Sequence, residues 1–268
     1  MQNKNIKILF FGDLVGRPGR FGVRDFLAGE HKADFIIANV ENASHGFGLT
    51  ENNYNQLIEY GVDCMTSGNH IWDKKDIFAF IDKADRLVRP FNYPAGVPGV
   101  GSRVFDNGIA VISVLGQIFM NPIDSPWQGV AKEIKRLKKI TPIVIVDFHA
   151  EATAEKVCFG KFCSELGVSA FFGTHTHVQT ADEQIINNMA YITDAGFCGA
   201  KDGIIGMDYQ TSITRFTTGL PERYEVADSG PWQINAVEVE IEPKTGHAIS
   251  VKRIFCEIDN IKEKDNES

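Results

Sequence analysis

Side chains that suit divalent metal ions follow short apolar runs at five places in the chain. They are Asp13, Glu41, Asn42, Asn69, His149, His175 and His177. Ions such as Mn, Fe and Zn are held in proteins by carboxylate oxygens, amide oxygens and imidazole nitrogens. The sequence therefore predicts a metal site with these seven residues as candidate ligands.

Some of these residues have simpler explanations when each is taken alone. An Asp that follows a strand often caps a helix, which is an equal alternative for Asp13. Two histidines separated by a single residue, as at His175 and His177, also occur in solvated loops. Gly173 favours a site, because glycine lets the backbone approach a site closely or adopt a positive φ. His70 follows a similar Gly-Asn pair, and histidine is a common acid or base in catalysis, so His70 is a candidate proton donor or a hydrogen-bonding neighbour of the site.

Alternating strands and helices would bring these distant residues together. Apolar runs typical of buried strands occupy residues 6–11, 33–40, 62–66, 142–148 and 170–172, and candidate ligands follow each run. Helical spacing is predicted at 21–27, after a loop rich in Gly, Pro and Arg, and at 53–60 and 127–139. Ligands of such α/β folds bind beyond the carboxyl ends of the strands, so we expect one spatial cluster.

Further elements follow from the same patterns. Strands are predicted at 102–105, 109–115 and 191–194, a helix at 209–216, and a closing β-hairpin from 233 to 254. The helix belongs to a small insertion near 207–222, which we interpret as either a lid or a contact element. Residues 263–268 are polar and are expected to form a frayed tail after a single domain at 1–262.

Composition narrows the class of protein. Of the 268 residues, 43% are hydrophobic and 23% are charged, which excludes a disordered chain. The net charge of -8 argues against non-specific attraction to nucleic acid or to an anionic membrane. A small anionic substrate stays compatible with this charge, because bound cations reverse the local field. The apolar run at 6–11 is too short for a signal peptide, and no run is long enough to span a membrane, so a cytoplasmic enzyme is expected.

The candidate residues lie in five longer motifs. These are Gly12-Asp13-Leu14-Val15-Gly16-Arg17-Pro18-Gly19-Arg20, Glu41-Asn42-Ala43-Ser44-His45-Gly46, Gly68-Asn69-His70-Ile71-Trp72-Asp73, Asp147-Phe148-His149-Ala150-Glu151-Ala152-Thr153 and Gly173-Thr174-His175-Thr176-His177-Val178-Gln179-Thr180-Ala181-Asp182. The motifs resemble those of the calcineurin-like binuclear metallophosphoesterases, and more closely the bacterial YmdB-type subfamily of cyclic-nucleotide phosphodiesterases. The resemblance covers nearly the whole chain.

The chain departs from the wider superfamily in its first three motifs. The usual Asp-x-His is Asp13-Leu14-Val15 here, so one histidine ligand is missing and Asn42 is expected to replace it. Glu41 stands where most members have a bridging Asp. The acidic residue that normally follows the motif histidine is found only at Asp73, which leaves open whether Asp73 orients His70.

The resemblance implies a fold, a metal centre and a reaction. The fold is a four-layer α-β-β-α sandwich that holds two divalent or trivalent ions, with Fe and Mn favoured and Zn as an alternative. One ion is assigned to Asp13, Glu41, Asn42 and His177, and the second to Asn69, His149 and His175, with Glu41 bridging. A hydroxide shared by the ions attacks phosphorus, and His70 protonates the leaving oxygen.

The same resemblance favours 2′,3′-cyclic nucleotides as substrates, with RNA 3′ ends as a further candidate. General phosphomonoesterase activity, or a regulatory metal- and nucleotide-binding role with vestigial hydrolysis, are the alternatives. A zinc-stabilised structural protein fits poorly, because the candidate ligands are rich in oxygen and include no cysteine. A homo-oligomer stays open, as do the roles of Arg17, Arg20 and His45.

Overall fold

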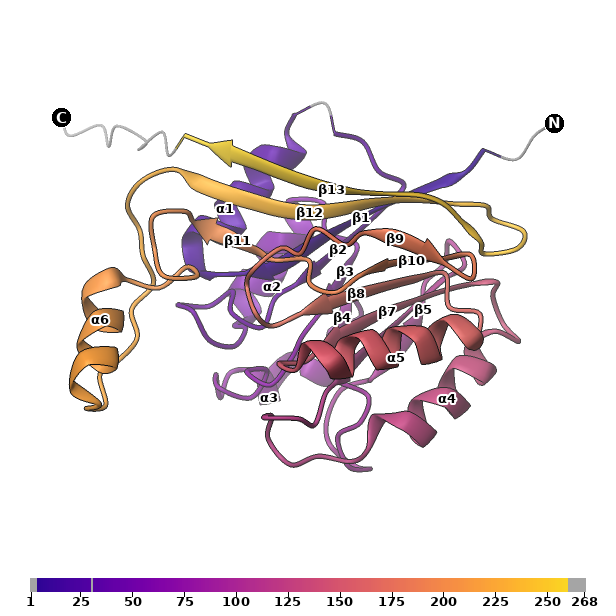
Figure 1. Cartoon of the computed structure of the whole chain (residues 1–268), viewed down its shortest axis with the longest axis horizontal. Helices are drawn as coiled ribbons and strands as arrows, with labels where there is room; N and C mark the ends of the chain where they lie inside the picture. The colour runs from indigo at the N-terminus through magenta and orange to yellow at the C-terminus, as the bar shows by residue number, and fades with distance from the viewer. Residues whose placement is uncertain (1–3, 30, 260–268) are drawn as a thin grey trace.

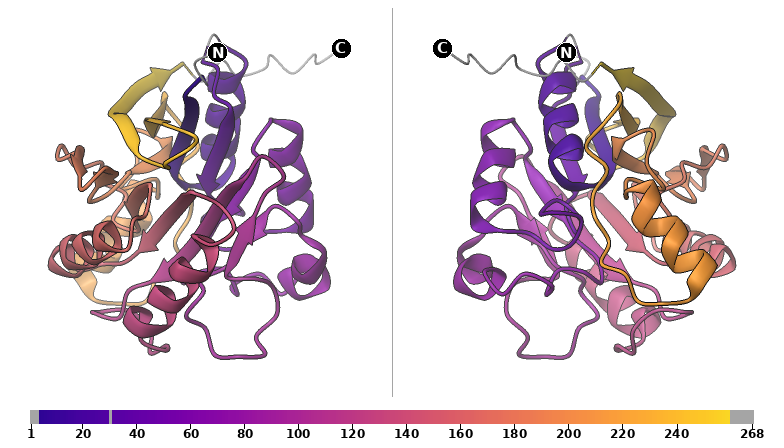
Figure 2. Two further views of the ribbon diagram at one scale, coloured as in Figure 1. Left: turned by 90° about the vertical axis from the view of Figure 1, so that its right-hand side faces the viewer. Right: turned by 90° about the vertical axis from the view of Figure 1, so that its left-hand side faces the viewer.

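Two β-sheets face each other at the centre of the molecule, and helices cover their outer faces (Figure 1, Figure 2). The computed structural model describes residues 4–29 and 31–259, so the tail expected at 263–268 lies outside the described residues. The first sheet has the order β13 (Ala248–Ile258), β12 (Trp232–Ile241), β11 (Phe197–Ala200), β1 (Ile6–Leu14), β2 (Phe35–Asn39), β3 (Cys64–Thr66) and β4 (Leu87–Val88). The second has the order β5 (Ser102–Val104), β6 (Ile109–Leu115), β7 (Ile143–His149), β8 (Ala170–Thr174), β10 (Met189–Ile192) and β9 (Gln184–Ile186).

Helices complete the four layers that the resemblance implies. The apolar cluster on the outer face of the first sheet includes residues of α1 (Gly16–Leu27) and α2 (Glu51–Glu59). The corresponding cluster on the second sheet includes residues of α4 (Pro126–Leu137) and α5 (Thr153–Glu165). The α-β-β-α sandwich is therefore confirmed. The short α3 (Ile77–Phe80) continues into a 3-10 turn (Ile81–Lys83), and α6 (Tyr209–Thr218) projects away from the sandwich (Figure 1).

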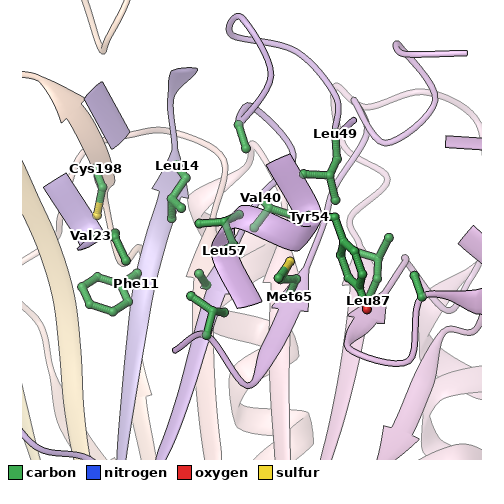
Figure 3. Packing of buried hydrophobic residues seen from close by; sticks show 14 of the residues in the cluster. Phe11, Leu14, Val23, Val40, Leu49, Tyr54, Leu57, Met65, Leu87 and Cys198 are labelled. Carbon is green, nitrogen blue, oxygen red and sulfur yellow. The ribbon is translucent and has the colours of Figure 1, made fainter. Parts of the chain in front are cut away.

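Strand β1 shows why continuous apolar runs mark the central strands. Ile8 and Phe10 face the second sheet, where the ring of Phe10 stacks on that of Phe172 with centroids 4.3 Å apart. The alternating residues Leu9 and Phe11 belong to the apolar cluster that includes residues of α1 and α2. Figure 3 shows Phe11 within this cluster. From Ile8 to Phe11 both faces of the strand are buried, so its side chains there must be apolar, whereas Lys7 before them is only partly buried. Burying one such phenylalanine stabilises the fold by roughly 1.5–3 kcal/mol.

Several elements differ from the sequence-based expectations. Helix α1 begins at Gly16, whereas a loop was expected before residue 21. Pro18 fits the first turn because a backbone N–H there would have no partner within the helix. Helix α5 and strand β11 were not expected. The hairpin of β12 and β13 is confirmed, as is a helix over 209–216. None of the helices in the described part of the chain is long and apolar enough to cross a membrane.

Candidate metal centre

The predicted ligands come from both sheets and meet at one edge of the sandwich. Asp13 lies near the carboxyl end of β1, Glu41 follows β2 and Asn69 follows β3, all in the first sheet. His149 ends β7 and His175 follows β8 in the second sheet. Strands β1, β2 and β3 run parallel to one another, as do β7 and β8, so the carboxyl ends within each sheet lie side by side.

Three potential ligand atoms converge on Nε2 of His149. Oε1 of Glu41 lies 3.0 Å from it, Oδ1 of Asn69 lies 3.1 Å from it, and Nδ1 of His175 lies 3.0 Å from it. Ligand atoms of Glu41, His149 and His175 all lie within 4.8 Å of one another. One imidazole nitrogen carries at most one hydrogen, so it cannot satisfy three such neighbours at once. A cation among these atoms fits the arrangement.

A second group of potential ligands lies beside the first. Nε2 of His177 is 3.3 Å from Oδ1 of Asn42, whose Nδ2 donates to the carbonyl of Gly46 at 2.9 Å and so fixes the orientation of the amide. Asp13 is fully buried, and its Oδ2 accepts a hydrogen bond from the backbone N–H of His175. Its Oδ1 has no hydrogen-bond partner among the described residues, although Nδ1 of His149 lies 3.6 Å away. A buried carboxylate oxygen without a hydrogen bond is costly, and a bound cation would satisfy it.

Each of the three imidazoles directs one ring nitrogen away from the cluster. Nδ1 of His149 lies 2.9 Å from the Thr174 hydroxyl, Nε2 of His175 lies 3.1 Å from Glu151, and Nδ1 of His177 lies 2.9 Å from the Ile205 carbonyl. Metal-binding histidines are held in this way, because the outer partner fixes the ring orientation and leaves the inner nitrogen for the ion. Glu151, from the same motif as His149, therefore contacts His175.

A buried polar network joins the two sheets behind the centre. Asp147 accepts hydrogen bonds from the Thr174 hydroxyl at 2.7 Å and from the Asn39 amide at 2.9 Å. Asn39 in turn accepts from the backbone N–H of Glu41 at 3.1 Å. The network therefore couples the position of Glu41 to that of His149. Asp147 is part of the motif around His149, whereas the roles of Asn39 and Thr174 were not predicted from the sequence.

Backbone geometry explains two of the glycines in the motifs. A side chain on Gly68 would overlap Glu41 and the ring of His149, so this loop requires a glycine to pass so close to the ligands. A side chain on Gly173 would overlap the carbonyl of Thr193. Gly173 therefore permits close backbone packing within the second sheet, and its φ is not among the positive values.

The loop that carries His175 and His177 has a strained backbone, and hydrogen bonds to Asp194 hold it in place. His175 and His177 have positive φ values of 103° and 62°, which cost on the order of 1–3 kcal/mol for residues other than glycine. Thr176 between them donates to Asp194 from its backbone N–H at 3.1 Å and from its hydroxyl at 2.7 Å. Asp194 is paired at 2.6 Å with Lys156 of α5, and both side chains are buried. This pair anchors the loop.

Electrostatic effects within the centre act in opposite directions on its members. Burial disfavours the charge of Glu41, yet His149 and His70 together lower its pKa to about 2. Burial likewise opposes the charge of His149, but the carboxylates of Glu41 and Asp13 raise its pKa to about 9. Burial and the neighbouring His149 lower the pKa of His175 to about 3. The charged forms of Glu41 and His149 thus stabilise each other.

Burial is also the main influence on the pKa of the two remaining ionisable candidates. It raises the pKa of Asp13 well above its usual range, although the charge of His149 acts against this shift. It lowers the pKa of His177, so this imidazole is neutral and able to bind a metal at neutral pH.

His70 lies beside the candidate ligands and is hydrogen-bonded to Asp73. Its Nδ1 lies 2.8 Å from Oδ2 of Asp73, which answers the question the sequence left open about Asp73. Its backbone N–H donates to Glu41 at 3.1 Å, and the ring of Phe47 packs edge-on against its imidazole. Among the described residues, no group bonds to Nε2 of His70, so this nitrogen is free to meet a substrate.

A cavity of about 390 Å³ gives access to the centre. Glu41, Asn42, His70, His175 and His177 form its polar wall. Its apolar wall is formed by Phe47, Ile204, Ile205, Met207, Phe216 and Tyr224. The cavity therefore places an aromatic surface next to a potential metal centre. The aromatic residues could not be assigned to the site from the sequence, because isolated aromatic residues are common in any core.

Known proteins resemble this chain over most of its length. A family model described as YmdB-like protein matches residues 9–254. The 2′,3′-cyclic-nucleotide 2′-phosphodiesterase of Bacillus subtilis is 46% identical over 263 residues, covering 96% of this chain and 99% of that protein. A crystal structure described as a novel phosphatase from Mycoplasma pneumoniae is 36% identical, with a TM-score of 0.89 over 97% of this chain and 95% of that chain. A hypothetical protein from Thermus thermophilus is 34% identical, with a TM-score of 0.87 over 94% of this chain and all of that chain. This chain therefore belongs to the YmdB-like family.

Proposed function

We propose that this protein is a metal-dependent phosphodiesterase that opens 2′,3′-cyclic nucleotides. The observation that carries the proposal is the convergence of Glu41, Asn69 and His175 on one nitrogen of His149. The name of the Bacillus subtilis relative supports the substrate class, since the similarity extends over 96% of this chain.

Two cations fit the donor atoms of the candidate centre. One would be held by Asp13, Glu41, Asn42 and His177, and the other by Asn69, His149 and His175, with Glu41 shared. The buried Oδ1 of Asp13, which forms no hydrogen bond with the described residues, supports the first position. Ligands so rich in oxygen favour Mn or Fe, and Zn is also compatible. When bound, two such ions supply Lewis acidity that activates water and neutralises phosphate charge.

His70 is proposed to protonate the departing oxygen. Opening the ring at O2′ breaks one P–O bond, forms one bond from phosphorus to the oxygen of water, and leaves a 3′-phosphate and a 2′-hydroxyl. The departing O2′ needs a proton, and Asp73 at Nδ1 favours the arrangement in which Nε2 of His70 delivers it. General acid catalysis of this kind contributes roughly 10²–10⁴-fold to turnover.

The aromatic wall of the cavity suits the nucleoside part of this substrate. Phe47 and Tyr224 lie 6.3 Å apart between ring centroids, and Phe216 lines the same cavity from α6. Stacking of a base on an aromatic ring is worth roughly 1–3 kcal/mol and tolerates any base. We therefore expect all four 2′,3′-cyclic nucleotides to be substrates.

The test combines activity with metal content. Protein loaded with Mn²⁺ should convert 2′,3′-cyclic AMP to 3′-AMP, and His70→Ala should lose most turnover while retaining its metal. His247→Ala, which removes an exposed histidine outside the residues that line the cavity, should behave like the parent protein. Normal turnover by His70→Ala would exclude His70 as the proton donor to the departing oxygen.

The same assay separates the alternative functions. Hydrolysis of phosphomonoesters at least as fast as that of cyclic nucleotides would favour a general phosphatase. Turnover slower than ligand release would favour a regulatory binding protein.

A further inference from the structure

A second cavity lies next to the candidate metal centre and gathers several cationic side chains. Its volume is about 470 Å³, and Tyr224 lines both this cavity and the first one. Its basic lining is Arg17, Arg20, His45 and Arg223. Arg17 and Arg20 belong to the motif at 12–20, and His45 belongs to the motif at 41–46. The sequence alone left the roles of these three residues open.

The wall between the two cavities is short. The loop that begins with Glu41 and Asn42 turns at His45, which has a positive φ of 58°. The following Gly46 lies close to Val226 and Met207, and its carbonyl accepts the hydrogen bond that orients Asn42. A ligand atom at the centre and one in the second cavity are thus separated by a single loop.

Arg20 is a partly buried cation that no carboxylate neutralises within the described part of the chain. Its Nε donates to the side chain of Gln56 at 3.1 Å and its Nη1 to the carbonyl of Ala43, both of which are uncharged. Burial lowers the pKa of its guanidinium, and the neighbouring Arg17 lowers it further. A charge withdrawn from water without a counter-ion is unfavourable, and an anionic ligand would offset that cost.

The other two guanidinium groups are exposed and available. Arg17 lies over the ring of Phe21 at 5.2 Å, which leaves its N–H edge for a ligand. Neither Arg17 nor Arg223 forms an ion pair with the residues that the structure describes. Arginine is suited to phosphate because its planar fork matches two phosphate oxygens.

We propose that this second cavity is an anion subsite that binds the 5′-phosphodiester of the nucleotide whose 2′,3′-cyclic phosphate occupies the metal centre. The inference rests on the proposed function and narrows its substrate to an RNA 3′ end. Both phosphates belong to one ribose, and Tyr224 lines both cavities, so one terminal nucleotide is the ligand whose two phosphates would occupy them. Glu225 and Asp228 also line the second cavity and suit a sugar hydroxyl, whereas they disfavour a strongly charged free polyphosphate.

The experiment compares substrates with and without the 5′-linked nucleotide. Mn²⁺-loaded protein is assayed with adenosine 2′,3′-cyclic phosphate and with the dinucleotide ApA that ends in a 2′,3′-cyclic phosphate. We expect kcat/KM to be at least about tenfold higher for the dinucleotide, mainly through KM. The double variant Arg17→Ala/Arg223→Ala should lower this ratio about tenfold. Arg136→Ala, which removes an exposed arginine on α4, should keep the parent ratio.

A binding measurement makes the result independent of turnover. Titration calorimetry compares 3′-AMP with adenosine 3′,5′-bisphosphate, which adds a phosphate at the 5′ position. Tighter binding of the bisphosphate that disappears in the double variant supports the subsite, even if neither cyclic substrate is hydrolysed and the proposed function fails. Equal binding of the two ligands, or a dinucleotide preference that the double variant retains, would overturn the subsite.

Discussion

Replacing Thr174 by valine should weaken metal binding although no proposed ligand is substituted. The Thr174 hydroxyl lies 2.9 Å from Nδ1 of His149 and donates to Asp147 at 2.7 Å, and all three side chains are fully buried. Valine has nearly the same shape, so the substitution creates no cavity and removes only the polar link.

The expected magnitude follows from the groups that lose a partner. A hydrogen bond to a charged group contributes about 1.5–3 kcal/mol, and Asp147 keeps its bond to Asn39. We therefore expect the free energy of unfolding to fall by about 2 kcal/mol in the metal-free protein. Loss of a partner that orients a metal-binding histidine typically weakens metal affinity by roughly 10–100-fold.

Thr174→Ser is the matched control. It keeps the hydroxyl and removes one buried methyl group, which costs about 1 kcal/mol but leaves His149 oriented. Urea unfolding measures the stability of both variants, and competition with a chelator measures their Mn²⁺ affinity. If valine preserves metal affinity as well as serine does, the Thr174 hydroxyl does not position His149 and the reasoning is wrong.

Three further predictions concern the same region. Asp73→Asn should lower kcat about tenfold with unchanged metal content, because it weakens the partner of His70; unaltered kcat would remove Asp73 from the site. Since Glu41 and Asp13 raise the pKa of His149 to about 9 despite its burial, a metal must displace a proton at neutral pH. Apparent Mn²⁺ affinity should therefore rise with pH and level off above about 9, and a pH-independent affinity in chelator competition would contradict this. Lys156→Met should destabilise the protein by about 3–5 kcal/mol in urea unfolding, because it leaves a buried carboxylate unpaired; a loss below about 1 kcal/mol would show that the ion pair is dispensable.

The sequence predicts the central strands well because their physical signal is local. The central part of a strand buried on both faces, such as residues 8–11 of β1, must be apolar, and its composition alone reveals it. Helix α5 gives no such signal, since Glu155 and Lys156 occupy its buried face. Glu155 accepts hydrogen bonds from the backbone N–H groups of Gln117 and Ile118. Lys156 forms its ion pair with Asp194. Both side chains are therefore buried for their polar contacts, and they interrupt the apolar spacing by which a buried helix face is predicted.

In the site, too, the features set by neighbouring residues in the sequence could be predicted, whereas contacts between distant segments could not. Residues that follow parallel strands meet at one sheet edge, which is why motifs from Asp13 to His177 could be predicted to cluster. The link between Asn39 and Asp147 joins residues 108 positions apart in two different sheets. Their contact depends on how the sheets pack, which no spacing in the sequence encodes. The second cavity depends likewise on residues 223–228 returning beside the first helix.

Anomalous X-ray diffraction at the Mn edge, from crystals of the Mn²⁺-loaded protein, tests the central claim most directly. The account predicts two ions per chain, one among Asn69, His149 and His175 and one among Asp13, Asn42 and His177, with Glu41 in contact with both. A single ion, or ions bound away from these side chains, would contradict it.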